Sequence, residues 1–530
     1  MMKKFILSFS LLLLALTANA QAPETIFARC YGGSQNEANG LTGLNNLGFA
    51  TLSADIGADS ALYIATYSAS TDGFVTENNG DEDIWILKLN AQGDTLWTKV
   101  LGGTLTERIG KILALPDGGC LIVGRTFSNN GDFGGAQFGS LNDAFAVRLN
   151  ATGGIVWNKR YGGTQDDMLY AVVPNGTGFV MVGETGSVDG DLDNSLVGYT
   201  CGWIVSVDAN GTLLWSKKTN GTVQNEDYIQ SFWNVAQAAD NSGWYAVGVT
   251  GDFADPDSDD ILFTKFDNNG AIVTKTTFGS NKGDGIGGIT VLPNGNIIMA
   301  GRASNATGNQ TYLGGPADAW LLSVSPAGVP IAEKLLGGTD WETFYDVKTN
   351  PAGDIFAAGF TRSTNNFAST TPYGGMDFWL VKLNANFDTL YTARLGGSAN
   401  DVAMAICKNA TALYLVGRTD SNDGAVSNNN GNRDVWVVKY KYTETPTTIV
   451  ETENPKLSIY PNPTQNYFTV NGNNSLIQSI SVYSTTGQQV FAGNYANQAI
   501  VAVNASFAGG IYTVAIQTNK GVYRQKLFIR

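Results

Sequence analysis

The chain of 530 residues contains no histidine. Histidine is the commonest general base and a frequent zinc ligand, so Ser-His and Cys-His nucleophile pairs and histidine-based zinc sites are excluded. The four cysteines, Cys30, Cys120, Cys201 and Cys407, are far apart in the sequence and form no CxxC motif. We therefore expect small buried thiols rather than a disulfide framework.

Positive charge and proline are also scarce. The chain has 32 Lys and Arg against 46 Asp and Glu, a formal net charge of −14, and only 14 Pro. An acidic surface repels phosphate backbones, so no nucleic acid partner is expected. No segment after residue 20 has the length and hydrophobicity of a transmembrane helix. The 64 Gly and 11% aromatic residues indicate a folded chain with a large core.

Residues 1–20 have the pattern of a secretory signal peptide. Lys3 and Lys4 precede an apolar run that ends at Leu16, and Ala18-Asn-Ala20 matches the A-x-A cleavage pattern. The apolar run is too short to span a membrane as a stable helix. We predict cleavage after Ala20 and export of the remaining chain.

One sequence unit recurs through the middle of the chain. It begins with Asp-x-Trp or a variant, continues through a short apolar segment, and in most copies ends with Gly-Gly followed by Thr or Ser. The copies begin 57 to 60 residues apart, at Asp83, Asp143, Cys201, Asp260, Asp318, Asp377 and Asp434. A period this regular indicates a repeat architecture.

Each unit is predicted to form four short antiparallel strands, which is the composition of a β-propeller blade. The last unit lacks its final strand, and residues 26–34 have the sequence of that missing strand. We therefore expect an all-β fold in which residues 22–442 form a seven-bladed β-propeller closed by the N-terminal strand. Its pairing with residues 434–440 removes two open sheet edges.

The composition changes after the repeats. Residues 443–455 are rich in Thr, Glu and Pro and predict a linker. Residues 456–530 contain at least five short segments of alternating apolar and polar residues. This pattern predicts a small C-terminal β-sandwich of the immunoglobulin-like type.

Four motifs in this last segment occur in a fixed order. They are Ile459-Tyr-Pro-Asn-Pro463, Ser481-Val-Tyr-Ser-Thr-Thr-Gly487, Gly510-Ile-Tyr512 and Lys526-Leu-Phe-Ile-Arg530. Together they resemble the type A C-terminal sorting domain of the Bacteroidetes type IX secretion system. The resemblance implies that the type IX machinery engages residues 456–530. It also implies secretion across the outer membrane, to the cell surface or the extracellular medium.

The repeats resemble a second family. Gly417-Arg-Thr-Asp-Ser-Asn-Asp-Gly424 and Trp97-Thr-Lys-Val-Leu-Gly-Gly-Thr104 are similar to the tandem propeller repeats of secreted Bacteroidetes proteins. This resemblance implies a fold and a route of export rather than an activity, because propellers host many unrelated functions.

One acidic residue follows each Gly-Gly element or its counterpart by a few positions. These residues are Glu37, Glu107, Asp167, Glu226, Asp284, Glu342 and Asp401. Repetition in every unit favours a structural role, in which the carboxylate accepts backbone N–H bonds at the start of the next strand. Shared cation binding is the alternative, because carboxylate oxygens are also cation ligands.

Each unit has a long polar loop between its second and third strands, and strand parity places these loops on one face. Aromatic side chains in them are candidates, as exposed rings, for stacking on a sugar or holding a peptide. The alternative is that a given ring packs under its own loop. The candidates are Phe74, Phe133, Phe138, Tyr199, Phe253, Tyr312, Phe367 and Tyr373.

Two of the loops also carry carboxylates at alternate positions. Asp189, Asp191 and Asp193 lie in the loop at residues 184–200, and Asp255, Asp257 and Asp259 lie in the loop at residues 250–259. The spacing matches the opening positions of calcium-binding loops, although the later Gly and Glu of an EF-hand loop are missing. Calcium is the only cofactor for which the sequence offers candidate ligands, and a solvated acidic loop is the alternative.

We therefore expect an exported propeller that acts as a binding, adhesion or scaffold module, with a glycan or protein ligand on the long-loop face. The alternative is a secreted carbohydrate-active or other hydrolytic enzyme that uses carboxylates on the same face. No catalytic residue can be assigned from the sequence.

Overall fold

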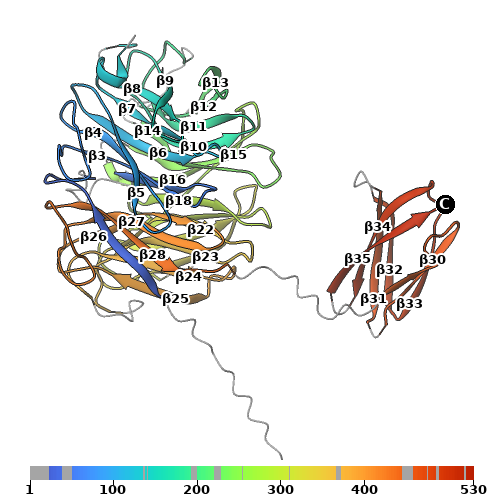
Figure 1. The fold of residues 1–530 in the computed structure, drawn as a ribbon. Helices are drawn as coiled ribbons and strands as arrows, with labels where there is room; N and C mark the ends of the chain where they lie inside the picture. The colour runs from blue at the N-terminus through green and yellow to red at the C-terminus, as the bar shows by residue number, and fades with distance from the viewer. Residues whose placement is uncertain are drawn as a thin grey trace, which may run out of the picture. The chain divides into compact units, whose positions relative to one another are not determined.

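The structure is a computed structural model. It describes residues 23–38, 51–134, 138–139, 141–192, 200–219, 228–252, 255–308, 311–365, 372–444, 457–473, 475–484, 489–518 and 521–530. The predicted signal peptide and all but two residues of the predicted linker lie outside these ranges. β-strands are the main secondary structure of the described residues (Figure 1), which also contain one short 3-10 helix, η1 (Gly131–Phe133). None of their helices has the length and hydrophobicity needed to cross a membrane.

The chain divides into two compact units, residues 1–444 and residues 445–530. Within its described residues, the first unit is built of repeated four-stranded antiparallel sheets. The first contains β2 (Leu52–Ile56), β3 (Leu62–Ser68), β4 (Asp83–Leu89) and β5 (Thr95–Leu101). The second contains β6 (Glu107–Ala114), β7 (Cys120–Thr126), β8 (Asp143–Leu149) and β9 (Ile155–Tyr161). The third contains β10 (Asp167–Asn175), β11 (Gly178–Thr185), β12 (Cys201–Val207) and β13 (Leu213–Lys218).

Three further sheets repeat this order along the chain. The fourth contains β14 (Tyr228–Gln237), β15 (Trp244–Asp252), β16 (Asp255–Phe266) and β17 (Ile272–Phe278). The fifth contains β18 (Gly285–Val291), β19 (Ile297–Ala303), β20 (Asp318–Val324) and β21 (Pro330–Leu336). The sixth contains β22 (Glu342–Thr349), β23 (Ile355–Thr361), β24 (Asp377–Leu383) and β25 (Thr389–Leu395).

The remaining sheet of this unit joins its two ends. It contains β26 (Asp401–Lys408), β27 (Ala412–Thr419), β28 (Asp434–Lys441) and β1 (Thr25–Tyr31). β1 pairs antiparallel with β28, with Cys30 opposite Trp436. A strand from the beginning of the unit therefore completes a sheet made by its end.

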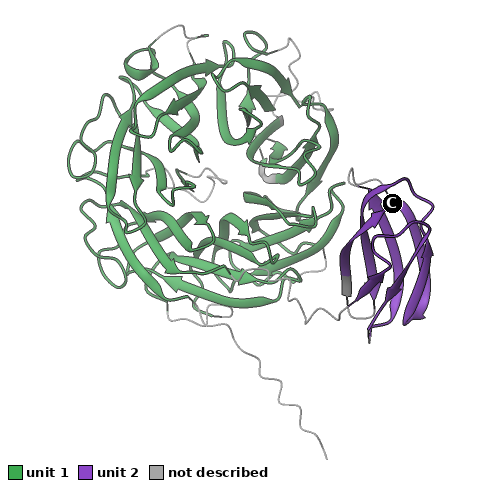
Figure 2. Ribbon diagram, turned by 45° about the vertical axis from the view of Figure 1, so that its right-hand side comes forward, with its two compact units in different colours: residues 1–444 green, residues 445–530 purple. Residues whose placement is uncertain are grey.

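The sheets follow one another around a ring (Figure 2). The first strand of each sheet contacts the first strand of the next, in the order β2, β6, β10, β14, β18, β22 and β26, and β26 contacts β2. The third strand of a sheet is buried along its length, as in β4, because both of its faces are covered by neighbouring sheets. The outermost strands are more exposed, as in β5.

The tryptophans of these third strands are buried between sheets: Trp85, Trp203, Trp379 and Trp436 are among the largest fully buried side chains. All four cysteines are described and buried, and none of them forms a disulfide, which confirms the expectation of buried thiols. The hydrophobic core of the first unit thus lies between adjacent sheets.

The second unit has two sheets in its described residues. One contains β29 (Ser458–Tyr460), β30 (Tyr467–Asn471) and β33 (Ile500–Asn504). The other contains β31 (Ile477–Ser484), β32 (Gln489–Gln498), β34 (Gly510–Thr518) and β35 (Gly521–Ile529). Phe468 and Val470 from the first sheet share one buried apolar cluster with Ile480, Val514 and Ile516 from the second.

The structure corrects the polar loop that the sequence predicts over residues 250–259. The described residues of this stretch extend β15 and β16, with Thr250 opposite Asp260 and Asp252 opposite Asp255. Asp is unfavourable in strands, but pairing satisfies the backbone N–H and C=O groups that a loop would leave to other partners. Strand pairing therefore outweighs the low strand propensity of the Asp residues in this stretch.

Candidate ligand-binding pocket

The innermost strands of six sheets are interrupted by a β-bulge at the same position. The register shifts between Ile109 and Lys111 in β6, and at the equivalent point of β10, β14, β18, β22 and β26. A bulge leaves one residue outside the strand ladder and redirects its side chain. The bulged residues are Gly110, Tyr170, Trp233, Gly287, Tyr345 and Met404.

All six bulged residues line one pocket between the innermost strands. Its volume is about 390 Å³, which lies in the range of small-molecule sites. Its wall combines aromatic side chains (Tyr67, Tyr170, Trp233 and Tyr345) with charged ones, of which Arg108, Lys111 and Arg125 are positive and Glu184 and Asp346 are negative. The pocket can therefore offer both ring faces and charges to a ligand.

The positive groups come from a single sheet. Arg108 and Lys111 lie on β6, and Arg125 lies opposite Arg108 on β7. The Arg108 guanidinium donates to Glu82 Oε2 at 2.6 Å and lies 4.3 Å over the Tyr67 ring. Burial, together with the nearby Lys348 ammonium, lowers the pKa of Lys111.

The two negative groups are engaged within the protein. The Asp346 carboxylate accepts the backbone N–H of Val347 at 2.8 Å and of Ile406 at 3.1 Å, and it forms an ion pair with Lys348. The Tyr170 hydroxyl donates to Glu184 Oε1 at 2.9 Å. Burial raises the pKa of Glu184.

Sequence reasoning missed this pocket, although one signal points to it. The position of Arg125 on the second strand of each sheet is occupied by residues of different charge and size. In most copies it lies three residues before a buried Ser at the start of the loop. The occupants of this position are Tyr67, Arg125, Glu184, Val249, Arg302, Phe360 and Arg418. A position that varies in charge inside an otherwise regular repeat is a candidate for function.

The five described aromatic candidates on the long-loop face do not converge, and none lines this pocket. Phe138 and Tyr373 are exposed, at 36% and 45%. Phe74 is half-buried against Tyr31, at 5.3 Å between ring centroids. Tyr312 is half-buried, and its hydroxyl donates to the backbone oxygen of Gly315. Tyr199, Phe253 and Phe367 lie outside the described residues.

The expectation that Phe133 is an exposed loop ring is wrong. Its side chain is only 1% exposed and packs against Phe145, with 4.8 Å between ring centroids. Phe133 is the last residue of η1 and the residue that this short helix buries. Burying an aromatic ring is favourable because it removes a large apolar area from water.

The candidate calcium ligands do not form a cluster. No group of three acidic or sulfur ligands suitable for a metal occurs among the described residues. Asp189 Oδ1 accepts the backbone N–H of Thr164 at 2.8 Å, and Asp191 Oδ2 accepts that of Gly162 at 3.2 Å. These carboxylates hold the loop against the preceding Gly-Gly turn. Asp193 lies outside the described residues.

The second calcium set lies in a strand. Asp255, Asp257 and Asp259 belong to β16 and therefore lie on an extended backbone and not in the loop that the sequence predicts. Asp259 is buried, and its Oδ1 has no hydrogen-bond partner among the described residues.

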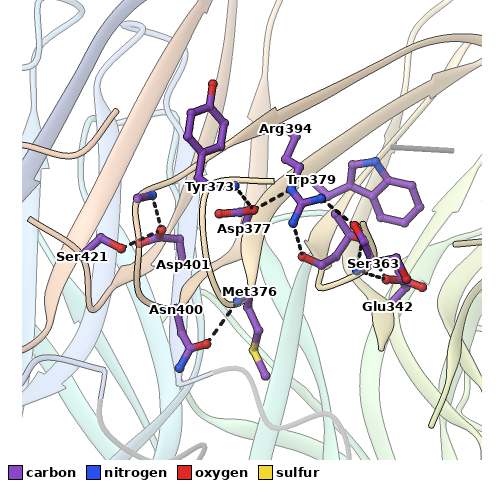
Figure 3. Close-up of polar contacts among 12 residues, drawn as sticks. Glu342, Ser363, Tyr373, Met376, Asp377, Trp379, Arg394, Asn400, Asp401 and Ser421 are labelled. Atoms are coloured by element: carbon purple, nitrogen blue, oxygen red, sulfur yellow. Dashed lines mark hydrogen bonds and ion pairs between the residues drawn. The ribbon is translucent and has the colours of Figure 1, made fainter. Parts of the chain in front are cut away.

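The repeated acidic residues have the structural role that the sequence favours. Six are described, and all are completely buried. Each accepts the backbone N–H of the residue four positions before it; the donors are Gly33, Gly103, Gly163, Ser280, Gly338 and Gly397. Asp401, for example, also accepts the Ser421 hydroxyl at 3.0 Å (Figure 3). Glu226 lies outside the described residues.

A second buried carboxyl group accompanies most of these residues. The leading Asp of a unit lies beside the acidic residue, as Asp83 lies beside Glu107 and Asp434 beside Glu37. A methyl group on the glycine between them would overlap both carboxyl groups at Gly32, which explains why glycine stands there. Burial and the neighbouring acid raise the pKa of Asp83 to about 7.

Known proteins resemble two parts of the chain. The family described as secretion system C-terminal sorting domain matches residues 458–530. The regulatory protein FlaEY of Caulobacter vibrioides is 24% identical over 394 residues, which cover 69% of this chain and 36% of that protein. The chain thus spans about a third of the length of this relative.

Solved structures with the same kind of repeated sheet are more distant. The Neurospora crassa Pan2 WD40 domain has 10% sequence identity and a TM-score of 0.42, over 80% of this chain and 100% of that one. Puromycin hydrolase has 11% identity and a TM-score of 0.42, over 92% of this chain and 62% of that one.

The match at the C-terminus coincides with the four ordered motifs, and the described part of the preceding unit consists of repeated four-stranded sheets. The sorting domain implies an interaction with the secretion machinery. Residues 458–530 therefore belong to the type IX secretion C-terminal sorting domains, and the chain is a secreted propeller protein that crosses the outer membrane to the cell surface or the extracellular space.

Proposed function

We propose that the protein is a seven-bladed β-propeller, closed by its N-terminal strand, that binds a small ligand in its central pocket after export. The order of the four-stranded sheets and the pairing of β1 with β28 support this blade count and closure. The proposed domains are the propeller at residues 22–442, the linker at 443–455 and a β-sandwich sorting domain at 456–530. The division of the chain after residue 444 supports them.

The observation that carries this function is the loss of sevenfold regularity at the centre. The buried carboxylates repeat around the ring, as expected of groups that hold the fold together. The bulged positions instead carry Tyr170, Trp233, Tyr345 and Met404 next to two glycines. Scaffold positions are regular in a repeat protein, whereas a ligand site breaks the symmetry of its scaffold.

Binding is favoured over hydrolysis by the state of the pocket carboxylates. A hydrolase without histidine needs a pair of carboxyl groups that can exchange protons with substrate. Asp346 is held by two backbone N–H groups and Lys348, and Glu184 is held by Tyr170. The experiment must therefore distinguish binding alone from hydrolysis of the bound ligand.

The test is an array of glycans and peptides probed with the full exported chain, scored for both binding and turnover. Met404→Trp fills part of the pocket with a larger side chain and should abolish binding. The parent chain should bind its ligand without turnover. The matched variant Phe138→Ala/Tyr373→Ala removes the two exposed rings of the long-loop face and should leave binding intact. Circular dichroism verifies that both variants fold.

Two results would contradict the proposal. Binding that survives Met404→Trp but is lost in the Phe138→Ala/Tyr373→Ala variant would place a glycan or protein ligand on the long-loop face. Turnover of a panel member would establish the enzyme alternative.

A further inference from the structure

The pocket carries more available positive charge than negative charge, although the chain as a whole has a net charge of −14. Asp346 is satisfied by two backbone N–H groups and a lysine, and Glu184 receives the Tyr170 hydroxyl. Arg108 is paired with Glu82. These groups are therefore already matched within the protein.

Arg125 and Lys111 are the two pocket cations that form no ion pair among the described residues, although Glu184 and Arg125 interact electrostatically. Arg125 Nε is buried and has no hydrogen-bond partner among the described residues, and its guanidinium is stacked 5.6 Å from the Phe127 ring centroid. Lys111 forms no ion pair with any residue that the structure describes. An unmatched buried N–H of a guanidinium costs desolvation energy unless a ligand accepts it.

Two more arginines occupy the position of Arg125 in other sheets and flank the pocket residue Tyr345. Arg302 and Arg418 both act on the Tyr345 hydroxyl electrostatically. Arg418 is only 4% exposed, and its Nη1 has no hydrogen-bond partner among the described residues. Positive charge therefore lies on two sides of the pocket: Arg125 on β7 supplies one side, and Arg302 and Arg418 near Tyr345 supply the other.

We propose that the central pocket binds its ligand through an anionic group, a carboxylate or a sulfate or phosphate ester, held by Arg125 and Lys111. This inference rests on the proposed function and adds the chemistry of the ligand to it. Arginine suits such a group because its planar guanidinium offers two parallel N–H donors to an oxyanion. The rings of Tyr170, Trp233 and Tyr345 then cover the rest of a small ligand.

The experiment titrates the full exported chain with citrate, inorganic sulfate and inorganic phosphate, and with galactose as a neutral control, by isothermal calorimetry. At least one anion should bind with a saturating curve that weakens as ionic strength rises, and galactose should not. Binding of citrate would indicate a carboxylate ligand, whereas binding of sulfate or phosphate would indicate a sulfate or phosphate ester.

Three substitutions and one control substitution test the assignment. Arg125→Gln and Lys111→Gln should each weaken anion binding by about tenfold or more, because a hydrogen bond to a charged group is lost. Arg148→Gln is the matched control: it lies on β8 of the same sheet, outside the pocket wall, and should leave binding unchanged. Glu184→Gln removes a negative charge beside Arg125 and should strengthen binding, an effect that a damaged fold would not produce.

Absence of saturable binding by all three anions overturns the inference, as does an Arg125→Gln variant that behaves like Arg148→Gln. The proposed function survives that failure if a neutral ligand from the array binds and Met404→Trp blocks it. If array ligands bind but Met404→Trp has no effect, the pocket itself is the wrong site.

Discussion

Arg394 Nε donates to Asp377 Oδ2 at 2.5 Å, and both side chains are completely buried (Figure 3). Arg160 forms the same pair with Asp143 at 2.7 Å. Most other sheets carry an uncharged residue two positions before the glycine turn, for example Val100 in the sheet of Asp83. The third sheet carries Lys218 there, but Cys201 replaces its leading Asp. The leading Asp therefore has two kinds of surroundings: it is paired with an arginine, or it lies beside an uncharged residue, where burial raises its pKa, as at Asp83.

Replacing Arg394 with Val should destabilise the protein by about 3–5 kcal/mol, because it leaves Asp377 buried without its cation. Urea denaturation measures the loss. The control Arg148→Gln should cost less, about 1 kcal/mol, because the Arg148 side chain is only half-buried and its partner Asp117 is exposed.

Adding Asp401→Glu to Arg394→Val should recover part of that stability. The double variant reproduces the sheet in which Asp83 lies beside Glu107 and Val100 replaces the arginine. A double variant no more stable than Arg394→Val would show that the two arrangements are not interchangeable.

The protein should become less stable as pH rises from about 5 to 8. The pKa values of Asp83, Asp318 and Glu37 are raised to about 7, chiefly by burial, whereas these groups ionise near pH 4 in an unfolded chain. Between these values the folded state binds protons that the unfolded state has released. For each such proton, the unfolding free energy falls by about 1.4 kcal/mol for every unit by which the pH rises within this range.

Thermal unfolding at several pH values measures this dependence. Asp83→Asn remains uncharged at every pH, so it should reduce the slope and raise the melting temperature at pH 8 relative to the parent chain. A parent melting temperature that rises between pH 5 and pH 8 would show that the buried pairs are ionised throughout.

Much of the first unit follows from its sequence because the repeat is long and regular. The positions of the leading Asp predict the third strands, and the acidic residues predict the hydrogen bonds at the start of the innermost strands. Both depend on contacts within one unit or between adjacent units. Local spacing is therefore sufficient to find them.

The pocket and the loops depend on geometry that spacing does not encode. A bulge at Tyr170 or Tyr345 moves one side chain out of the alternation of its strand, and the sequence pattern gives no sign of it. The burial of Phe133 depends on a single 3-10 turn, and the strands at residues 250–252 and 255–259 depend on their mutual pairing. These features are decided by tertiary contacts.

Deleting residues 22–34 should lower the melting temperature of the entire first unit. The deletion removes β1 and leaves the edge of β28 unpaired, with its backbone N–H and C=O groups exposed. The matched control exchanges Ile26, an exposed residue of β1, for Thr, and should have little effect. An unchanged midpoint after the deletion would mean that β1 contributes nothing to closing the ring.

Deleting residues 455–530 should leave the first unit folded but retain it in the periplasm. The deleted segment forms a unit with its own apolar cluster, so its loss removes no core from the repeats. Cell fractionation and the melting temperature of the retained protein measure the two effects. Normal amounts of the shortened chain on the surface or in the medium would contradict the role of residues 458–530 in export.

The bulges also separate the positions that encode folding from those that encode recognition. A residue outside the ladder can change with little effect on strand pairing, so Tyr170, Trp233, Tyr345 and Met404 are open to evolutionary exchange. Gly110 and Gly287 are not, because a side chain there would strike the backbone of the next innermost strand. Substitutions at these four positions can therefore change which ligand the pocket accepts without changing the strand pairing of the sheets.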